Sequence, residues 1–147
     1  MLFLTDRQGI PLACSDPISG QHNDLFEIAK TVSKMLTTLR QAQIEVDGLF
    51  LNGDAGFDAK VLRQLCDQFG IFPNLAINKR NTSKQDHLDY LFDPELYKER
   101  FAVERTNAWL DSFKALLVRF ETNAKHWLAL HYIAFSFILI RRTEAWA

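Results

Sequence analysis

The sequence has few cysteines, almost no net charge and no apolar run long enough to cross a membrane. Its two cysteines, Cys14 and Cys66, lie far apart and in no metal-ligand spacing, which favours ordinary thiols in the cytosol. The most apolar stretch, 127–140, is shorter than the roughly 20 residues of a membrane span, and His131 and Ser136 interrupt it. Charged residues follow the first four residues almost at once, so no signal peptide is expected. We therefore expect a cytoplasmic protein with no membrane partner.

The composition is that of one folded domain. The chain has 147 residues, and 48% of them are hydrophobic, which is enough for a core and argues against disorder. The net charge of −1 suggests no class of partner. However, residues 1–58 carry 4 Lys and Arg against 8 Asp and Glu, whereas residues 59–147 carry 13 against 10. The mildly basic second part permits a polyanionic partner without requiring one.

Local patterns predict an α/β fold. Runs of β-branched and aromatic residues bounded by turn residues predict strands at 2–5, 10–15, 48–53 and 71–78. Apolar residues at helical spacing predict helices at 24–43, 59–69, 94–117 and 123–142. The first two strands form a hairpin. Helices alternate with strands after it, which points to a mixed sheet with helices on its faces.

Helix ends carry recognisable signals. Asp24 with Glu27 three residues later is similar to a capping box, Asp58 precedes the second helix, and Asp93 precedes Pro94 at the start of the third. Gly70 is expected to end the second helix. The last helix should begin after Thr122 or Asn123 and end at 141–142.

The buried side chains can be assigned from the same periodicity. His22 is expected in a loop, whereas His126 and His131 are expected to pack near Trp127. The second helix should bury Val61, Leu62, Leu65, Cys66 and Phe69. A cluster of aromatic residues should attach the last two helices to the sheet: Trp109, Phe113, Phe120, Trp127, Tyr132, Phe135 and Phe137.

Two carboxylates stand out as candidates for chemistry. Asp54 directly follows an apolar strand and a glycine, and sites in such sheets gather at the carboxyl ends of strands. Glu104 shares a narrow stripe of the 94–117 helix with Tyr97, Arg100 and Asp111. Carboxylates from different elements can hold a divalent cation such as Mg²⁺, but they can equally be a strand-end turn residue and an acid on a solvated helix face. The spacing alone leaves both interpretations open.

Several motifs occur in the order found in bacterial insertion-sequence transposases with a DDE catalytic domain. Tyr97-x-x-Arg100-x-x-x-Glu104 resembles the first three letters of that family's Y-R-E-K signature. The stretch 103–110 looks like its third-carboxylate helix, and 54–58 resembles the D-x-G-Y/F-D segment around the second carboxylate. Residues 4–12 and 22–24 are similar to the strand pair and loop between the first two carboxylates.

The resemblance implies a ribonuclease-H-like fold and an Asp-Asp-Glu triad that binds Mg²⁺ or Mn²⁺. It implies DNA hydrolysis and strand transfer at transposon ends, with double-stranded DNA as partner and association with the nucleoid. Asp54 would be the second metal ligand and Glu104 the third, supported by Tyr97 and Arg100. The residues that would contact DNA are Lys79, Arg80, Lys84, Arg105 and Lys114.

Two features depart from the family pattern. Asp111 stands where the signature has lysine, and Lys114 lies about 60° further round the helix at roughly 100° per residue. The family's first aspartate lies on a strand before the hairpin, and we expect that strand to be missing from 1–147, as is a separate N-terminal DNA-binding domain. Asp6, Asp24 and Asp58 match non-catalytic positions.

Three interpretations follow. The chain is the C-terminal part of a transposase catalytic domain that needs an upstream segment to supply the first aspartate, and is inactive alone. Alternatively, it is a non-catalytic remnant that binds full-length transposase or DNA. The third interpretation, an α/β scaffold of unrelated function, has no motif in its favour.

Overall fold

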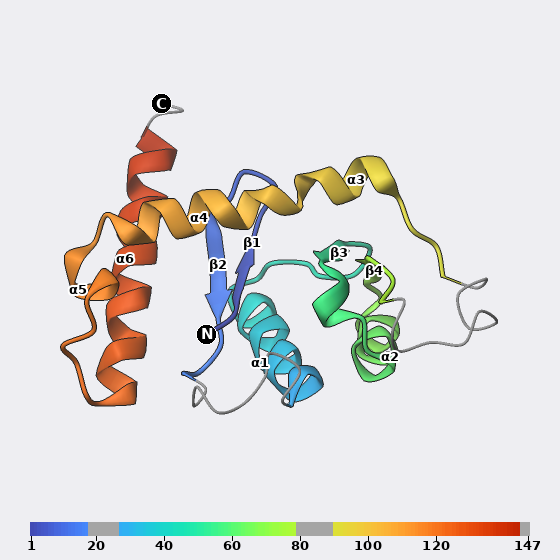
Figure 1. The fold of residues 1–147 in the computed structure, drawn as a ribbon, viewed down its shortest axis with the longest axis horizontal. Coiled ribbons are helices and arrows are strands. Elements are labelled where there is room, and N and C mark those ends of the chain that lie inside the picture. The colour runs from blue at the N-terminus through green and yellow to red at the C-terminus, as the bar shows by residue number, and fades with distance from the viewer. Residues whose placement is uncertain (18–26, 79–89, 145–147) are drawn as a thin grey trace. The chain divides into compact units, whose positions relative to one another are not determined.

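The computed structural model describes residues 1–17, 27–78 and 90–144, which belong to two compact units (Figure 1). One unit comprises Met1–Ser19 and Phe101–Ala147, and the other comprises Gly20–Arg100. Each contains helices and strands, which confirms the α/β class. The described strands form two two-stranded sheets, so they do not by themselves make the single mixed sheet expected. No helix in the described residues is long and apolar enough to span a membrane.

The first unit begins with the predicted hairpin. Strand β1 (Phe3–Thr5) pairs antiparallel with β2 (Pro11–Cys14). In the turn between them, Asp6 Oδ1 accepts the backbone N–H groups of Gln8 at 2.9 Å and of Ile10 at 2.8 Å. Gly9 follows with a φ of 85°, a left-handed conformation that favours glycine. Asp6 is therefore a turn residue, as the sequence indicated.

Three helices complete the first unit: α4 (Ala102–Asp111), α5 (Lys114–Leu117) and α6 (Ala124–Glu144). Helices α4 and α6 pack against the hairpin (Figure 1). Their common core consists of Cys14, Leu110, Ala134, Phe135 and Ile138. Helix α6 begins after Asn123, whose side chain accepts the N–H of Lys125 at 2.9 Å, so Asn123 is the cap.

The single helix predicted at 94–117 is wrong. The chain forms α3 (Pro94–Lys98), a 3₁₀ turn η2 (Glu99–Phe101) and then α4, which ends at Asp111. The backbone of Phe113 is extended, with φ −89° and ψ 101°, so Lys114 starts the separate helix α5. The angle inferred between Asp111 and Lys114 assumed one continuous helix and does not apply, because the extended Phe113 lies between them.

The second unit is built on two parallel strands. Strand β3 (Phe50–Gly53) pairs with β4 (Phe72–Leu75), from Phe50 opposite Phe72 to Gly53 opposite Leu75. Helix α2 (Lys60–Phe69) packs on β4, and α1 (Ile28–Gln41) packs on α2. A short 3₁₀ turn, η1 (Ala55–Phe57), joins β3 to α2. Gly70 ends α2 with a φ of 69°, as predicted.

Helix α1 buries the apolar face that its periodicity predicted: Ile28, Val32, Met35, Leu36 and Leu39. Its expected cap, Asp24, and the loop residue His22 lie outside the described residues.

Several expected core residues are exposed instead. Val61 is 53% exposed on α2, and Phe120 is 83% exposed in the connection between α5 and α6. Helix α6 is apolar around most of its circumference, but the core covers only one side of it. Phe135 is therefore buried, whereas Tyr132 and Phe137 are exposed. His126 is also exposed, while His131 is buried beside Phe3 and Trp127.

Candidate functional site

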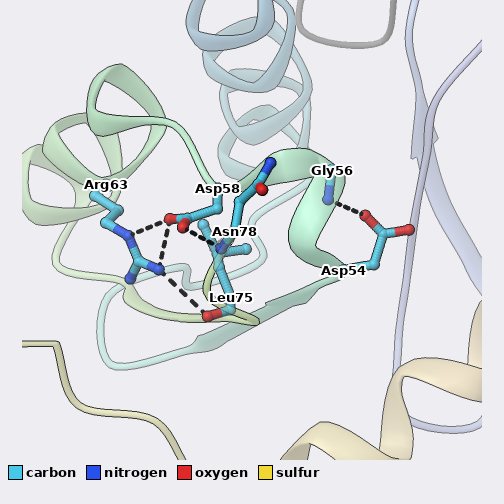
Figure 2. Close-up of polar contacts among 6 residues, drawn as sticks. All are labelled: Asp54, Gly56, Asp58, Arg63, Leu75 and Asn78. Carbon is cyan, nitrogen blue, oxygen red and sulfur yellow. Dashed lines mark hydrogen bonds and ion pairs between the residues drawn. The ribbon is translucent and has the colours of Figure 1, made fainter. Parts of the chain in front are cut away.

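Asp54 stands at the carboxyl end of β3, in a turn whose shape two glycines make possible (Figure 2). Its Oδ1 accepts the backbone N–H of Gly56 at 2.8 Å, and its side chain is exposed. A Cβ on Gly53 would lie 2.7 Å from the Leu75 side chain, and one on Gly56 would lie 2.9 Å from Asp54 Oδ1. The turn therefore fixes one carboxylate oxygen. The other, Oδ2, makes no hydrogen bond within the described part of the chain.

Asp58 does not cap helix α2, contrary to the sequence-based prediction. The helix begins after Ala59, which makes no capping side-chain hydrogen bond. Instead, Asp58 is buried and binds Arg63 one turn into the helix. Its second oxygen accepts the N–H of Asn78 at 2.8 Å (Figure 2). Because its two oxygens bind Arg63 and Asn78, the Asp58 carboxylate is buried and does not accept the N–H groups at the start of α2.

Two asparagines that sequence reasoning missed attach α3 to the parallel strands. Asn52 and Asn74 are opposite one another in β3 and β4, and Asn74 Nδ2 donates to Asn52 Oδ1 at 2.8 Å. Asn74 also exchanges two hydrogen bonds with the backbone of Asp93, and Asn52 donates to the carbonyl of Leu96. The available sequence signal was an asparagine within each of two short apolar strands, and the structure places these two opposite one another, with Asn74 buried and Asn52 half-buried. They hold the start of α3 against the sheet.

The start of α3 confirms its predicted cap. The Asp93 carboxylate accepts the N–H groups of Glu95 at 2.9 Å and Leu96 at 3.0 Å, directly before a helix that opens with proline. Tyr97 packs on Phe92, with ring centroids 5.1 Å apart, and the Arg100 guanidinium lies 4.8 Å from the Tyr97 ring centre. Tyr97 and Arg100 are thus in contact with each other.

Glu104 belongs to the first unit, in the first turn of α4, where an acid is favoured by the helix dipole. Its side chain is exposed and makes no ion pair with the described residues. Helix α4 is fixed to the hairpin by Thr106, which is fully buried and donates its hydroxyl to the carbonyl of Gly9. A Cβ on Gly9 would lie 2.6 Å from the Ala102 carbonyl oxygen, so only glycine allows this approach.

The remaining candidate residues are the basic side chains proposed from the sequence to contact DNA, together with Asp111. Arg105 is exposed and donates to the carbonyl of Arg7 at 3.3 Å, and Lys114 is exposed at the start of α5. Lys79, Arg80 and Lys84 lie outside the described residues. Asp111 is exposed and lines a small open pocket together with Asn107 and His131.

The described side chains narrow the possible chemistry. Burial raises the pKa of Cys14 to about 11 and that of Cys66 to about 11, so both thiols are protonated at neutral pH and are poor nucleophiles. Burial also lowers the pKa of His131, whose Nδ1 lies 2.9 Å from the Trp127 carbonyl oxygen. Among residues 1–17, 27–78 and 90–144, no three His, Cys, Asp or Glu side chains form a metal-binding group.

Comparison with known proteins identifies the class to which this arrangement belongs. The family model described as "Transposase DDE domain" matches residues 4–139, which is nearly the whole chain. The chain therefore belongs to the family of transposase DDE domains, and the resemblance drawn from its motifs is confirmed.

One relative is the "Putative transposase for insertion sequence element IS402" of Burkholderia cepacia. It is 30% identical over 125 residues. The match covers 83% of this chain and 53% of the relative, so the chain spans about half the length of that protein. No solved structure matches the chain.

Proposed function

We propose that this chain is the C-terminal part of an insertion-sequence transposase that hydrolyses and transfers DNA strands at transposon ends. The proposal rests on the position of Asp54 in a chain that belongs to the transposase DDE domain family. It is an exposed carboxylate at the carboxyl end of a parallel strand, with one oxygen fixed by Gly56. The second oxygen, Oδ2, makes no hydrogen bond with the described residues and is therefore available to coordinate a divalent cation, which prefers oxygen ligands.

The proposed metal ligands are Asp54 and Glu104, each exposed in its own unit. Carboxylates are the ligands that Mg²⁺ and Mn²⁺ prefer, so these residues fit such an ion. When bound, the metal would supply stabilisation of the attacking and leaving oxygens of a phosphodiester. The protein's part is to hold both carboxylates in place. We also propose that this chain has the ribonuclease-H-like fold that its family implies.

We assign supporting roles to six basic side chains of this chain. The Arg100 guanidinium, stacked on Tyr97, has the fork geometry that suits a phosphate. Arg105, Lys114, Lys79, Arg80 and Lys84 are proposed contacts to the DNA backbone, which position the duplex without selecting its sequence. A protein engaged in this way would associate with the nucleoid.

The first aspartate of the triad is proposed to come from a segment outside this chain. Asp6 cannot easily serve, because its Oδ1 already holds two N–H groups of the hairpin turn. A strand carrying the first aspartate would precede the hairpin and complete the sheet. The chain by itself should then bind DNA or transposase without cutting.

The test is a nicking assay with Mg²⁺ and duplex DNA that carries the element's ends. The chain is assayed alone and joined to the segment encoded directly upstream of its Met1 codon. We expect no nicking by the chain alone and nicking by the joined protein. Asp54→Asn and Glu104→Gln should abolish nicking, whereas the exposed control Asp67→Asn should leave it unchanged.

Other results would change the proposal. Nicking by the chain alone that disappears in Asp54→Ala would show that no upstream aspartate is needed. If the joined protein binds the ends but never nicks them, the chain is a non-catalytic remnant. Joined protein that nicks equally well with Asp54→Asn would remove Asp54 from the metal site.

A further inference from the structure

A buried ion pair, Asp58–Arg63, lies beside the turn that carries Asp54, and Asp58 directly follows that turn (Figure 2). Arg63 on α2 donates to Asp58 Oδ1 from Nε at 2.9 Å and from Nη2 at 2.8 Å. The side chains are only 7% and 5% exposed, so neither charge is screened by bulk water. Both are also too buried to touch DNA or a metal in this arrangement.

The two side chains of this pair also form contacts with other segments of the same unit. Arg63 Nη2 also donates to the carbonyl of Leu75 at 3.3 Å, at the end of β4. Asp58 Oδ2 accepts the N–H of Asn78 at 2.8 Å. The guanidinium lies 4.0 Å from the ring centre of Tyr90, shortly before α3. One ion pair therefore contacts the turn after β3, helix α2, the end of β4 and the approach to α3.

The directions of these contacts suggest what the pair does. A buried ion pair is seldom a better stabiliser than apolar residues of the same size, because desolvation offsets most of the attraction between the charges. Apolar residues, however, could not fix a carbonyl, an N–H and a ring from three segments at defined angles. A planar guanidinium and a carboxylate do so, because each has several directed partners.

The position of the turn makes this relevant to Asp54. The turn is anchored at one end by Gly53, which pairs with Leu75 in the sheet, and at the other end by Asp58. Between them, the N–H of Phe57 donates to the carbonyl of Asp54 at 3.0 Å. If Asp58 is released, the turn is held at one end only, and the carboxylate of Asp54 loses its fixed place.

We propose that Asp58 and Arg63 are positioning residues that set the conformation of the Asp54 turn and its alignment with the end of β4. Their relevance to catalysis rests on the proposed function, but the positioning itself does not. The two are therefore tested by separate measurements.

The first measurement is amide hydrogen exchange of the 147-residue chain by NMR. Asp58→Asn removes one charge and leaves Arg63 buried without an anion, so this variant is expected to unfold more readily. The double variant Asp58→Leu/Arg63→Met removes both charges with apolar groups of similar size and is expected to regain the parent's melting temperature. The exposed substitution Asp67→Asn is the control.

Positioning predicts a local defect in the refolded double variant. The amides of Phe57 and Asn78 should exchange about tenfold faster or more, while that of Leu36 in α1 stays protected as in the parent. Unchanged exchange at Phe57 and Asn78 would overturn the proposal. Faster exchange spread equally over all amides would also overturn it, because the pair would then act only on global stability.

The second measurement is the nicking rate of the joined protein. With the local defect present, the double variant should nick at least about tenfold more slowly and bind the DNA ends with unchanged affinity. A local defect with an unchanged rate would overturn the relevance of this positioning to catalysis and leave the positioning itself intact, while the role of Asp54 is tested separately by Asp54→Asn. Parent protein that never nicks would reject the proposed function alone, since the exchange result is independent of it.

Discussion

Replacing Asn74 with leucine should weaken the attachment of α3 to the parallel strands. Asn74 is 3% exposed, and its amide makes three hydrogen bonds. Nδ2 donates to Asn52 Oδ1 at 2.8 Å and to the Asp93 carbonyl at 3.0 Å, and Oδ1 accepts the Asp93 N–H at 2.8 Å. Leucine has nearly the same size but can make none of them, so the substitution tests the polar contacts and not the packing.

The expected cost follows from the groups left without partners. Three polar groups lose their hydrogen bonds, and a partly buried group of this kind costs about 1 kcal/mol each. Asp93 is exposed, so water can replace some of its lost bonding. Leucine returns about 1 kcal/mol by burying apolar surface. The free energy of unfolding should therefore fall by about 2 kcal/mol.

The assay is urea unfolding followed by far-UV circular dichroism, with the exposed residue Gln64 changed to alanine as the control. Tryptophan fluorescence gives a second signal, because the three tryptophans all fall in the sequence of the first unit. The dichroism midpoint should move to lower urea. A double-mutant cycle with Asn52→Leu should give a coupling of about 1 kcal/mol. A loss below about 0.5 kcal/mol with no coupling would refute the reasoning.

Two further predictions concern the first unit. Gly9→Ala should cost about 2 kcal/mol or more, because the new Cβ combines a φ of 85° with a clash against the Ala102 carbonyl oxygen. Gly48→Ala has a similar φ of 78° and open space, so it should cost only about 1 kcal/mol; equal losses would rule out the clash. Burial lowers the pKa of His131 below its ordinary 6.5, so the unfolded chain takes up this proton first. The stability contributed by neutral His131 should be complete above pH 6.5 and be lost as pH falls towards and through the native pKa. His131→Gln should flatten that part of the stability curve, whereas exposed His126→Gln should not.

Several ends of helices and turns could be predicted from the sequence, because they depend on contacts between residues close together in the chain. Asp93 before proline, Gly70 after an apolar helix and Asp6 in a hairpin turn each form contacts within a few residues, so their neighbours in sequence determine what they do. The buried face of α1 was equally readable, because its period of 3.6 residues is set by the helix itself.

The prediction of one continuous helix at 94–117 was wrong, because helical periodicity does not show where a helix is interrupted. Residues on either side of Phe113 have helical periodicity, but the backbone of that residue is extended and divides α4 from α5. Phe120 and Phe137 were assigned to the core because they are aromatic, yet Phe120 is 83% exposed before α6 begins and Phe137 is 51% exposed on the side of α6 that the core leaves open. Periodicity states which residues share a face, but not whether another element covers it.

The sequence by itself determined the α/β class, the caps and turns, and the family through its motifs around Asp54 and Glu104. The tertiary structure decided which partners the polar residues between these motifs bind. Asp58 looks like a helix cap in sequence, but Arg63 draws it into a buried pair that reaches Leu75 and Asn78. The physical reason is distance along the chain: Arg63 is only five residues from Asp58, but Leu75 is 12 residues from Arg63 and Asn78 is 20 residues from Asp58, so only the folded chain brings these partners to the pair.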